Sequence, residues 1–182
     1  MTFGSQSDRI GDWMQTHSGL MYYPIDPRED DICIEDIAHA LAMLCRFGGH
    51  CLRFYSVAEH SVHVARAAPD GLKLTALLHD ASEAYLGDVI RPLKKALPAY
   101  KAAELNLEEV LSKKFKTVFP LPSEVKGLDD AVLFDELTQN MSKPPKPWAV
   151  RNGLGAKLQF WGPQQAKAEF LNSFKKYAII GH

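Results

Sequence analysis

The chain has 182 residues, of which 46% are hydrophobic and 24% charged, close to the composition of an ordinary globular protein. A chain of this length can bury about 70% of its unfolded surface, so neither disulfides nor a structural metal are needed to hold a core. A net charge of −1 argues against a nucleic-acid-binding surface, which would be basic.

Helical spacing of apolar residues dominates the first half of the chain. The helices predicted there cover residues 35–47, 57–68 and 72–86. Gly48-Gly49 is expected to stop the first of them and Gly87 the third, since glycine commonly ends a helix. Arg91-Pro92 is expected to open a loop.

Three further helices are predicted over residues 99–116, from Ser123 onward, and over 163–177. Pro120 and Pro122 separate the first two, and the stretch 143–147 (KPPKP) predicts a stiff connector in which a helix cannot persist. No run of alternating residues predicts a strand. The sequence therefore predicts an all-α fold, a single compact helical bundle over residues 1–182.

Cysteine content and hydropathy indicate the compartment. The three cysteines, at positions 33, 45 and 51, include no CxxC pair, so a zinc knuckle or redox pair is not expected, and we interpret them as buried or inert thiols. An odd cysteine count fits a reducing compartment. Residues 1–12 are polar, unlike a signal peptide, and no apolar stretch approaches the roughly 18 residues of a membrane span. We expect a cytoplasmic protein without a membrane partner.

Three ionisable residues share one face of the helix predicted over residues 72–86. His79 and Asp80 lie beside its apolar stripe, and Glu83 follows them by four and three residues, which is same-face spacing in an α-helix. Ionisable groups among apolar side chains are costly to bury without a partner. A bound cation would be such a partner, because His and carboxylates are ligands of transition metals.

The helix predicted over residues 57–68 supplies a further candidate ligand. His60 occupies an inward position that usually holds Leu or Ile, although a hydrogen-bonded core histidine is the alternative interpretation. His63 is left out of the metal shell, because Glu59 lies four residues earlier and can satisfy it as a surface pair.

A carboxylate is expected to close the site from the helix that begins at Ser123. Asp129 is the candidate, because it shares a face with Glu136 seven residues later and borders apolar residues. Asp130 is its rival.

The order His60, His79-Asp80, Asp129 resembles the H…HD…D signature of the HD-domain phosphohydrolases. The segments 56–61 (SVAEHS) and 79–88 (HDASEAYLGD) are similar to the 5′-deoxynucleotidase-like branch of that family, which includes phage dATP triphosphohydrolases. This resemblance covers about residues 13–141, the core of the predicted domain, and leaves residues 143–182 as a proline-rich connector and C-terminal helix.

The resemblance implies one divalent transition-metal ion, Zn, Co or Mn, as cofactor. The ligands that it implies are His60, His79, Asp80 and Asp129. No histidine lies between Asp80 and Asp129, so the extra ligands of HD enzymes with two or three metal ions are missing.

Roles in catalysis and substrate binding are also implied by the resemblance. Glu83 matches the carboxylate that handles the attacking water or its proton, and Asp88 matches the residue that reads the sugar edge and favours a deoxyribose. The implied substrate contacts are Arg46, Phe47, Lys94 and Lys126. Phe47 stands where relatives commonly carry Trp, a departure that leaves the base preference open.

The expected function is metal-dependent hydrolysis of a deoxyribonucleotide phosphate bond. The enzyme would be either a dNMP 5′-nucleotidase or a dNTP triphosphohydrolase, with dATP as one candidate substrate. The alternatives are a catalytically inactive HD module that binds nucleotide as a sensor, and a nuclease. The expected partners are a small-molecule nucleotide and further copies of the chain in a dimer or larger homo-oligomer, but no nucleic acid.

Overall fold

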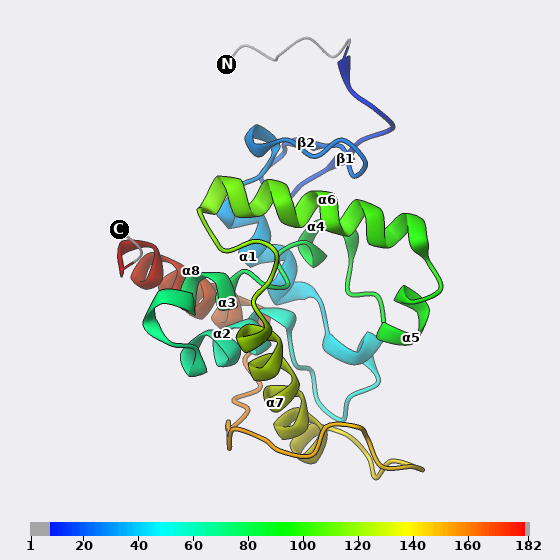
Figure 1. Cartoon of the computed structure of the whole chain (residues 1–182), viewed down its shortest axis with the longest axis vertical. Helices are drawn as coiled ribbons and strands as arrows, with labels where there is room; N and C mark the ends of the chain where they lie inside the picture. Colours follow the sequence, from blue (N-terminus) through cyan, green and yellow to red (C-terminus); the bar gives the residue numbers. More distant parts are fainter. Residues whose placement is uncertain (1–7, 181–182) are drawn as a thin grey trace.

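Helices make up most of the computed structural model, which describes residues 8–180 (Figure 1). This range contains eight α-helices and one antiparallel pair of short strands, which confirms the predicted all-α class. None of the helices in this range has both the length and the apolar character of a membrane span. Residues 1–7 and 181–182 of the predicted domain lie outside the described residues. The elements in chain order are β1 (Met14–Gln15), β2 (Met21–Tyr22), α1 (Ile34–Met43), α2 (Val57–Ala67), α3 (Lys73–Leu77), α4 (Glu83–Leu86), α5 (Arg91–Lys94), α6 (Pro98–Phe115), α7 (Ser123–Asn140) and α8 (Pro163–Ile180).

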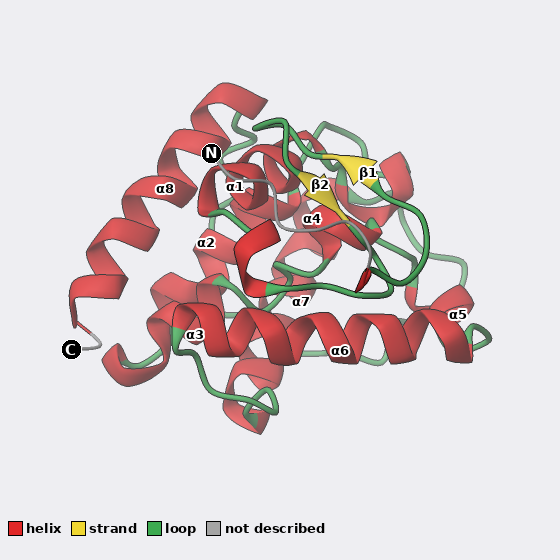
Figure 2. Cartoon of the chain, turned by 90° about the horizontal axis from the view of Figure 1, so that it is seen from above, coloured by secondary structure: helices red, strands yellow, loops and turns green. Residues whose placement is uncertain are grey.

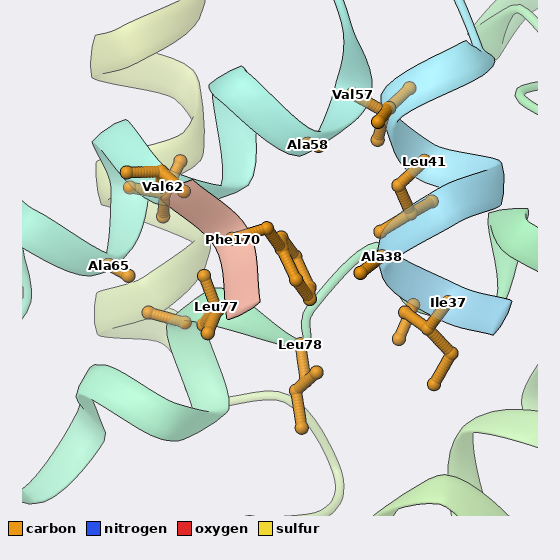
Figure 3. Close-up of a cluster of buried hydrophobic side chains, with 14 of the residues drawn as sticks. Ile37, Ala38, Leu41, Val57, Ala58, Val62, Ala65, Leu77, Leu78 and Phe170 are labelled. Atoms are coloured by element: carbon orange, nitrogen blue, oxygen red, sulfur yellow. The ribbon is translucent and has the colours of Figure 1, made fainter. Parts of the chain in front are cut away.

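Helix α2 is central to the core and contacts α1, α3, α7 and α8. Ser56 caps its beginning, because the Ser56 hydroxyl accepts a hydrogen bond from the backbone N–H of Glu59 at 3.1 Å. Phe170 of α8 is fully buried and lies among apolar side chains of α1, α2 and the end of α3 (Figure 3). Truncating such a ring costs about 3–5 kcal/mol, so α8 is an integral part of the core.

Two buried carboxylates hold the long segment that connects α7 to α8. Asp135 of α7 accepts hydrogen bonds at 2.8–3.2 Å from the backbone N–H groups of residues 154–156. Glu59 of α2 accepts hydrogen bonds at 2.6–3.0 Å from those of residues 159–161. Figure 1 shows this segment, in yellow to orange, returning along α7 before α8 begins. The carboxylates therefore replace the hydrogen bonds that secondary structure would provide.

A short hairpin that the sequence did not predict lies over α1 and α4 (Figure 2). Each strand has only two residues, too few for an alternating pattern. The ring of Tyr22 in β2 stacks on that of Tyr85 in α4, with centroids 4.3 Å apart. Asp36 of α1 accepts hydrogen bonds from the backbone and side chain of Ser18, in the hairpin turn. The hairpin is therefore tied to both helices.

The first predicted helix ends four residues earlier than expected, at Met43. The chain then becomes extended, because Cys45 forms a β-bridge with Ser56 and the backbone N–H of Arg46 donates to the carbonyl of Tyr55. Gly48-Gly49 therefore does not stop this helix. Instead it forms, with Arg46 and Phe47, a tight turn of residues 46–49 in which residues 47–49 all have positive φ.

The predicted helix over residues 72–86 is interrupted, which is a second correction. Helix α3 ends at Leu77 and α4 begins at Glu83. Between them the backbone bonds have i→i+3 spacing, as in the bond from the N–H of Glu83 to the carbonyl of Asp80. His79 and Asp80 thus lie in a tight turn of residues 78–82. His79, Asp80 and Glu83 therefore do not share one continuous α-helix, although residues i and i+3 also lie on one face of a 3₁₀ turn.

The loop expected at Arg91-Pro92 is also wrong, because these residues begin the short helix α5. Proline is compatible with this position, since the first helical N–H groups have no intrahelical acceptor. Helix α5 packs beside α6 at one edge of the molecule (Figure 1).

Candidate metal centre

Three of the predicted ligands converge from three separate segments. His60 comes from α2, His79 from the turn after α3, and Asp129 from α7. One ligand atom of each lies within 4.8 Å of the others. The Nε2 atoms of the two histidines are 3.3 Å apart, and Asp129 Oδ1 is 3.1 Å from His60 Nε2. Such convergent nitrogen and oxygen donors can hold a divalent metal ion.

Asp80 joins this group from the same turn as His79. Its Oδ2 atom lies 3.2 Å from Nε2 of His79 and 3.6 Å from Nε2 of His60. Asp130, the rival of Asp129, does not: its half-exposed carboxylate instead pairs with Arg91 at 3.1 Å. The structure therefore brings three of the predicted ligands into one group and places the fourth, Asp80, beside both histidines.

Each histidine is oriented by an acceptor on its other ring nitrogen. His79 Nδ1 lies 2.8 Å from the carbonyl oxygen of Ala76, and His60 Nδ1 lies 2.6 Å from Oε1 of Glu136. An acceptor beside Nδ1 favours the tautomer with the proton on that nitrogen, so Nε2 is the atom that can bind a metal once the imidazole is neutral. A ring held in this way is prepared to bind a metal.

Glu136 is the main site residue that the sequence analysis did not assign. It is fully buried, and its Oε2 atom accepts hydrogen bonds from Nε and Nη2 of Arg46 at 3.2 and 3.1 Å. The sequence feature that could have identified Glu136 is its spacing of seven residues from Asp129, which places both on one face of the helix. A carboxylate on the inward face of α7 needed a buried partner, and that partner is shared between Arg46 and His60.

The electrostatic environment shifts the pKa values of Asp80 and Glu83 in opposite directions. Burial opposes ionisation of Asp80, but the charges of His79, His60 and Arg46 outweigh it and hold the pKa of Asp80 far below its usual range. Burial, together with the charges of Asp80 and Asp88, raises the pKa of Glu83 well above its ordinary value. Two neighbouring acids are thus tuned for opposite protonation states.

His60 and Asp129 form a second tuned pair. Burial and the charge of Arg46 act to lower the pKa of His60, but Glu136 and Asp129 raise it to about 9. Burial acts to raise the pKa of Asp129, but its hydrogen bond with His60 and the histidine charges lower it. The cluster is therefore a preformed charge arrangement in which a divalent cation can replace the histidine proton.

Glu83 is buried, and its Oε2 atom has no hydrogen-bond partner within residues 8–180. Nζ of Lys94 lies 4.0 Å from its other oxygen and is bound to Glu104 at 2.6 Å. Asp88 follows Gly87, whose φ of 80° turns the chain at the end of α4. Burial raises the pKa of Asp88. The charge of Asp80 adds to this effect, and the charges of Arg46 and Lys94 oppose it.

The predicted substrate contacts divide into near and distant groups. Nη1 of Arg46 lies 3.6 Å from Oδ2 of Asp80, beside the cluster. Phe47 is half-buried in the turn of residues 46–49, with its ring centroid 5.5 Å from Cζ of Arg46. Lys126 is exposed on α7, and its charge acts on Glu108. The structure therefore places Arg46 beside Asp80, Lys94 beside Glu83 and Phe47 next to Arg46, whereas Lys126 is exposed on α7.

The predicted surface pair of His63 and Glu59 needs correction, and Arg91 is an additional residue of the site. His63 and Glu59 do pair, at 3.5 Å, but both are buried rather than at the surface. Arg91 was not assigned to the site, yet its Nη2 atom donates to Oδ2 of Asp129 at 2.8 Å while Oδ1 faces His60. Its position at the start of α5 could not be inferred from the loop that was expected there.

Comparison with known proteins identifies two relatives. The chain is 35% identical over 166 residues to the uncharacterized protein YfdR of Escherichia coli K12, covering 89% of this chain and 93% of that protein. It is 40% identical over 124 residues to an uncharacterized protein of Rhodobacter capsulatus, covering 63% of each chain. No protein-family model matches the chain.

Proposed function

We propose that the chain, which belongs to the same protein family as YfdR of Escherichia coli, is a metal-dependent phosphohydrolase that acts on deoxyribonucleotides. The convergence of His60, His79 and Asp129, with Asp80 beside them, carries this proposal. The resemblance of the same residues to the H…HD…D signature supplies the reaction class.

The donor set fits a single divalent transition metal. His60 and His79 would supply Nε2 atoms, and Asp80 and Asp129 would supply carboxylate oxygens, a mixture that suits Zn, Co or Mn. When bound, such an ion promotes the ionisation of water and offsets negative charge on a phosphate group. The buried contact of Glu136 with His60 is the type of outer-shell support that metal-binding histidines need.

The side chains around the cluster would transfer a proton and bind the phosphate. Glu83, whose pKa is raised by burial and by the charges of Asp80 and Asp88, can hold a proton beside the cluster and exchange it with the attacking water or the phosphate. Arg46 keeps Nη1 on the Asp80 side while its other nitrogens bind Glu136, so one arm of the guanidinium is left for a phosphate oxygen. Lys94 adds positive charge beside Glu83.

Asp88 and Phe47 are proposed to bind the nucleoside. The Asp88 carboxylate is partly buried, lies within reach of the charges of Arg46 and Lys94, and can accept a hydrogen bond from a sugar hydroxyl. Phe47, with exposed Ile90 near the neighbouring Gly48, offers an apolar surface for a base. Monophosphate and triphosphate substrates both agree with this arrangement. We also propose a cytoplasmic location and a homo-oligomeric state, both as the sequence analysis expects.

The test is a substrate panel of dNMPs, dNTPs, ribonucleotides and a single-stranded oligonucleotide, each with Co²⁺, Mn²⁺ or Zn²⁺. Products are separated by chromatography, so release of phosphate is distinguished from release of an intact triphosphate. We expect hydrolysis of a deoxynucleotide that requires added metal. Cleavage of the oligonucleotide alone would indicate a nuclease, and binding without turnover would indicate a sensor.

Asp80→Ala is the variant that links the chemistry to the cluster. It should lose both bound metal and activity while remaining folded, because a metal ligand is removed. Asp70→Ala is the matched control, since the Asp70 side chain is 82% exposed and lies outside the cluster. Full metal content and turnover in the Asp80 variant would contradict the assignment.

A further inference from the structure

Two thiols face each other across the turn of residues 46–49. The Sγ atoms of Cys45 and Cys51 are 3.5 Å apart, and Sγ of Cys51 is also 3.9 Å from the carbonyl oxygen of Arg46. Both cysteines are free and partly exposed, so the expectation of buried thiols is wrong for this pair, and their proximity could not be inferred from the absence of a CxxC motif. A disulfide places its sulfurs at about 2.05 Å, so these two atoms need to approach by only about 1.5 Å.

The backbone on each side of the turn holds the two thiols in this arrangement. Cys45 is fixed by its β-bridge to Ser56. Beyond Cys51, the backbone N–H of Leu52 donates to the carbonyl of Asn140, and that of Arg53 donates to the Asn140 side chain at 2.9 Å. Since both ends of the segment are anchored, the proximity of the sulfurs does not depend on a free loop.

We propose that Cys45 and Cys51 form a dithiol site that reacts with a small disulfide, such as oxidised glutathione, to give an intrachain disulfide. The thiolate of one cysteine attacks the small disulfide and releases one thiol, forming a mixed disulfide. The second cysteine then attacks the protein sulfur of this mixed disulfide and releases the other thiol. The two cysteines are oxidised by two electrons, and one molecule of the small disulfide is reduced to two thiols.

Cys51 lies in an environment that disfavours its thiolate. Burial raises the pKa of the Cys51 thiol, and the hydrogen bond and charge of Cys45 raise it further. A thiol with a raised pKa forms less thiolate and attacks an external disulfide slowly. Either cysteine can make the first attack, because the other sulfur lies 3.5 Å away and can then resolve the mixed disulfide.

The cross-link would enclose a segment that belongs to the candidate metal centre. Arg46 and Phe47 lie between the two cysteines, and Arg46 holds Glu136, the partner of His60. The sulfurs are already adjacent while these contacts are made, so the disulfide restrains the turn in its observed position. Formation of the disulfide goes beyond the proposed hydrolysis and does not require it.

The experiment exposes the reduced, full-length chain to a series of oxidised and reduced glutathione ratios and measures intact mass and peptide linkage. We expect the loss of two hydrogen masses, a peptide pair linked through Cys45 and Cys51, and reversal by reductant. Cys33→Ser is the matched control and should oxidise in the same way. Cys45→Ser and Cys51→Ser each keep two thiols and should instead stop at free-thiol or mixed-disulfide species without an internal link.

The result that overturns the proposal is a wild-type chain that retains all its thiols or accumulates only mixed disulfides. An equal yield of internal disulfide in the Cys45 or Cys51 variant would overturn the assignment to this pair. Oxidised wild-type protein should also melt about 3–8 °C higher than reduced protein, because a short loop is closed. An unchanged Tm would overturn the restraint on the turn. None of these readouts depends on nucleotide hydrolysis.

Discussion

Oε1 of Glu136 lies 2.6 Å from Nδ1 of His60, on the side of the ring that faces away from the candidate metal. His60 Nε2 is therefore the nitrogen that faces Asp129. The second oxygen of Glu136 is occupied by Arg46, so the buried carboxylate is satisfied on both sides. Glu136 thus links a fixed cation, Arg46, to the orientation of a metal ligand.

Glu136→Gln should lower the affinity for Co²⁺ about 10–100-fold, because the neutral amide no longer orients and polarises His60 as a carboxylate does. The variant should also melt at a lower temperature, since Arg46 loses its anionic partner. Calorimetric titration with Co²⁺ and a thermal melt measure the two effects. Glu109→Gln is the control, because Glu109 is half-exposed and its carboxylate pairs with Lys113 away from the cluster. An affinity within twofold of wild type would show that Glu136 has no role at the metal.

The sequence predicted those features of the fold that depend on residues close together along the chain. The helix predicted over residues 57–68 is α2, and the inward position predicted for His60 is confirmed, because its side chain is fully buried. The break after α3 was not predictable, because Leu77, Leu78 and Ala81 fit a continuous helical stripe. The turn there is instead held by i→i+3 bonds and by the contact of His79 with the Ala76 carbonyl.

The partners that complete the site are far apart in the sequence, which is why spacing could not identify them. Arg46 and Glu136 are 90 residues apart, and Glu59 binds a segment about 100 residues later. The spacing of Glu136 to Asp129 showed that an acid faces the core. It did not show which residues it meets, since that depends on how α2 and α7 pack.

Glu83→Gln should retain the metal and lose about 10²–10⁴-fold in kcat, because a positioned acid or base contributes about that much. Burial and the nearby acids already favour a neutral side chain at this position, so the amide should be tolerated in the fold. Metal analysis and steady-state kinetics on the same preparation separate binding from chemistry. Glu124→Gln, an exposed change at the start of α7, is the control. Near-normal turnover in the Glu83 variant would reduce Glu83 to a structural residue.

Gly153→Ala should destabilise the fold by about 1–3 kcal/mol through overpacking. A Cβ at this position would overlap Oδ1 of Asp135 and lie 2.8 Å from its Cγ, and that carboxylate is held by the backbone N–H groups of residues 154–156. Gly71→Ala is the matched control, because its Cβ would meet no atom within 4 Å. Thermal melts of both variants decide the question. Equal Tm values would show that Asp135 does not fix this segment.

Asp36 should make stability depend on acid pH. Burial acts to raise its pKa, but hydrogen bonds from Ser18 and Thr16 outweigh burial and lower it below the ordinary 3.8. The folded state therefore binds fewer protons than the unfolded state. The contribution of Asp36 is fully present above the ordinary pKa and is lost as the pH falls through the lower folded value. Denaturant unfolding measured between about pH 2 and pH 7 covers both pKa values. The free energy of unfolding should fall less steeply toward acid pH for Asp36→Asn than for wild type. Parallel curves would contradict this role.

Asp88→Asn should lower kcat/KM for deoxynucleotides and narrow their advantage over the matching ribonucleotides. The turn at Gly87 is fixed by the hydrogen bond from the Tyr100 hydroxyl to the Gly87 carbonyl at 2.9 Å, which places Asp88 where the charges of Arg46, Asp80 and Lys94 reach it. A carboxylate there accepts a strong hydrogen bond from a sugar 3′-hydroxyl, and a site closed around that bond leaves little space for a 2′-hydroxyl. Asp88 does not cap α5, whose N-cap is Ile90, so a purely structural role is not needed to explain it. Asp30→Asn, an exposed change outside the site, is the control. If both the rate and the deoxy-to-ribo ratio of the Asp88 variant equal those of wild type, Asp88 does not read the sugar.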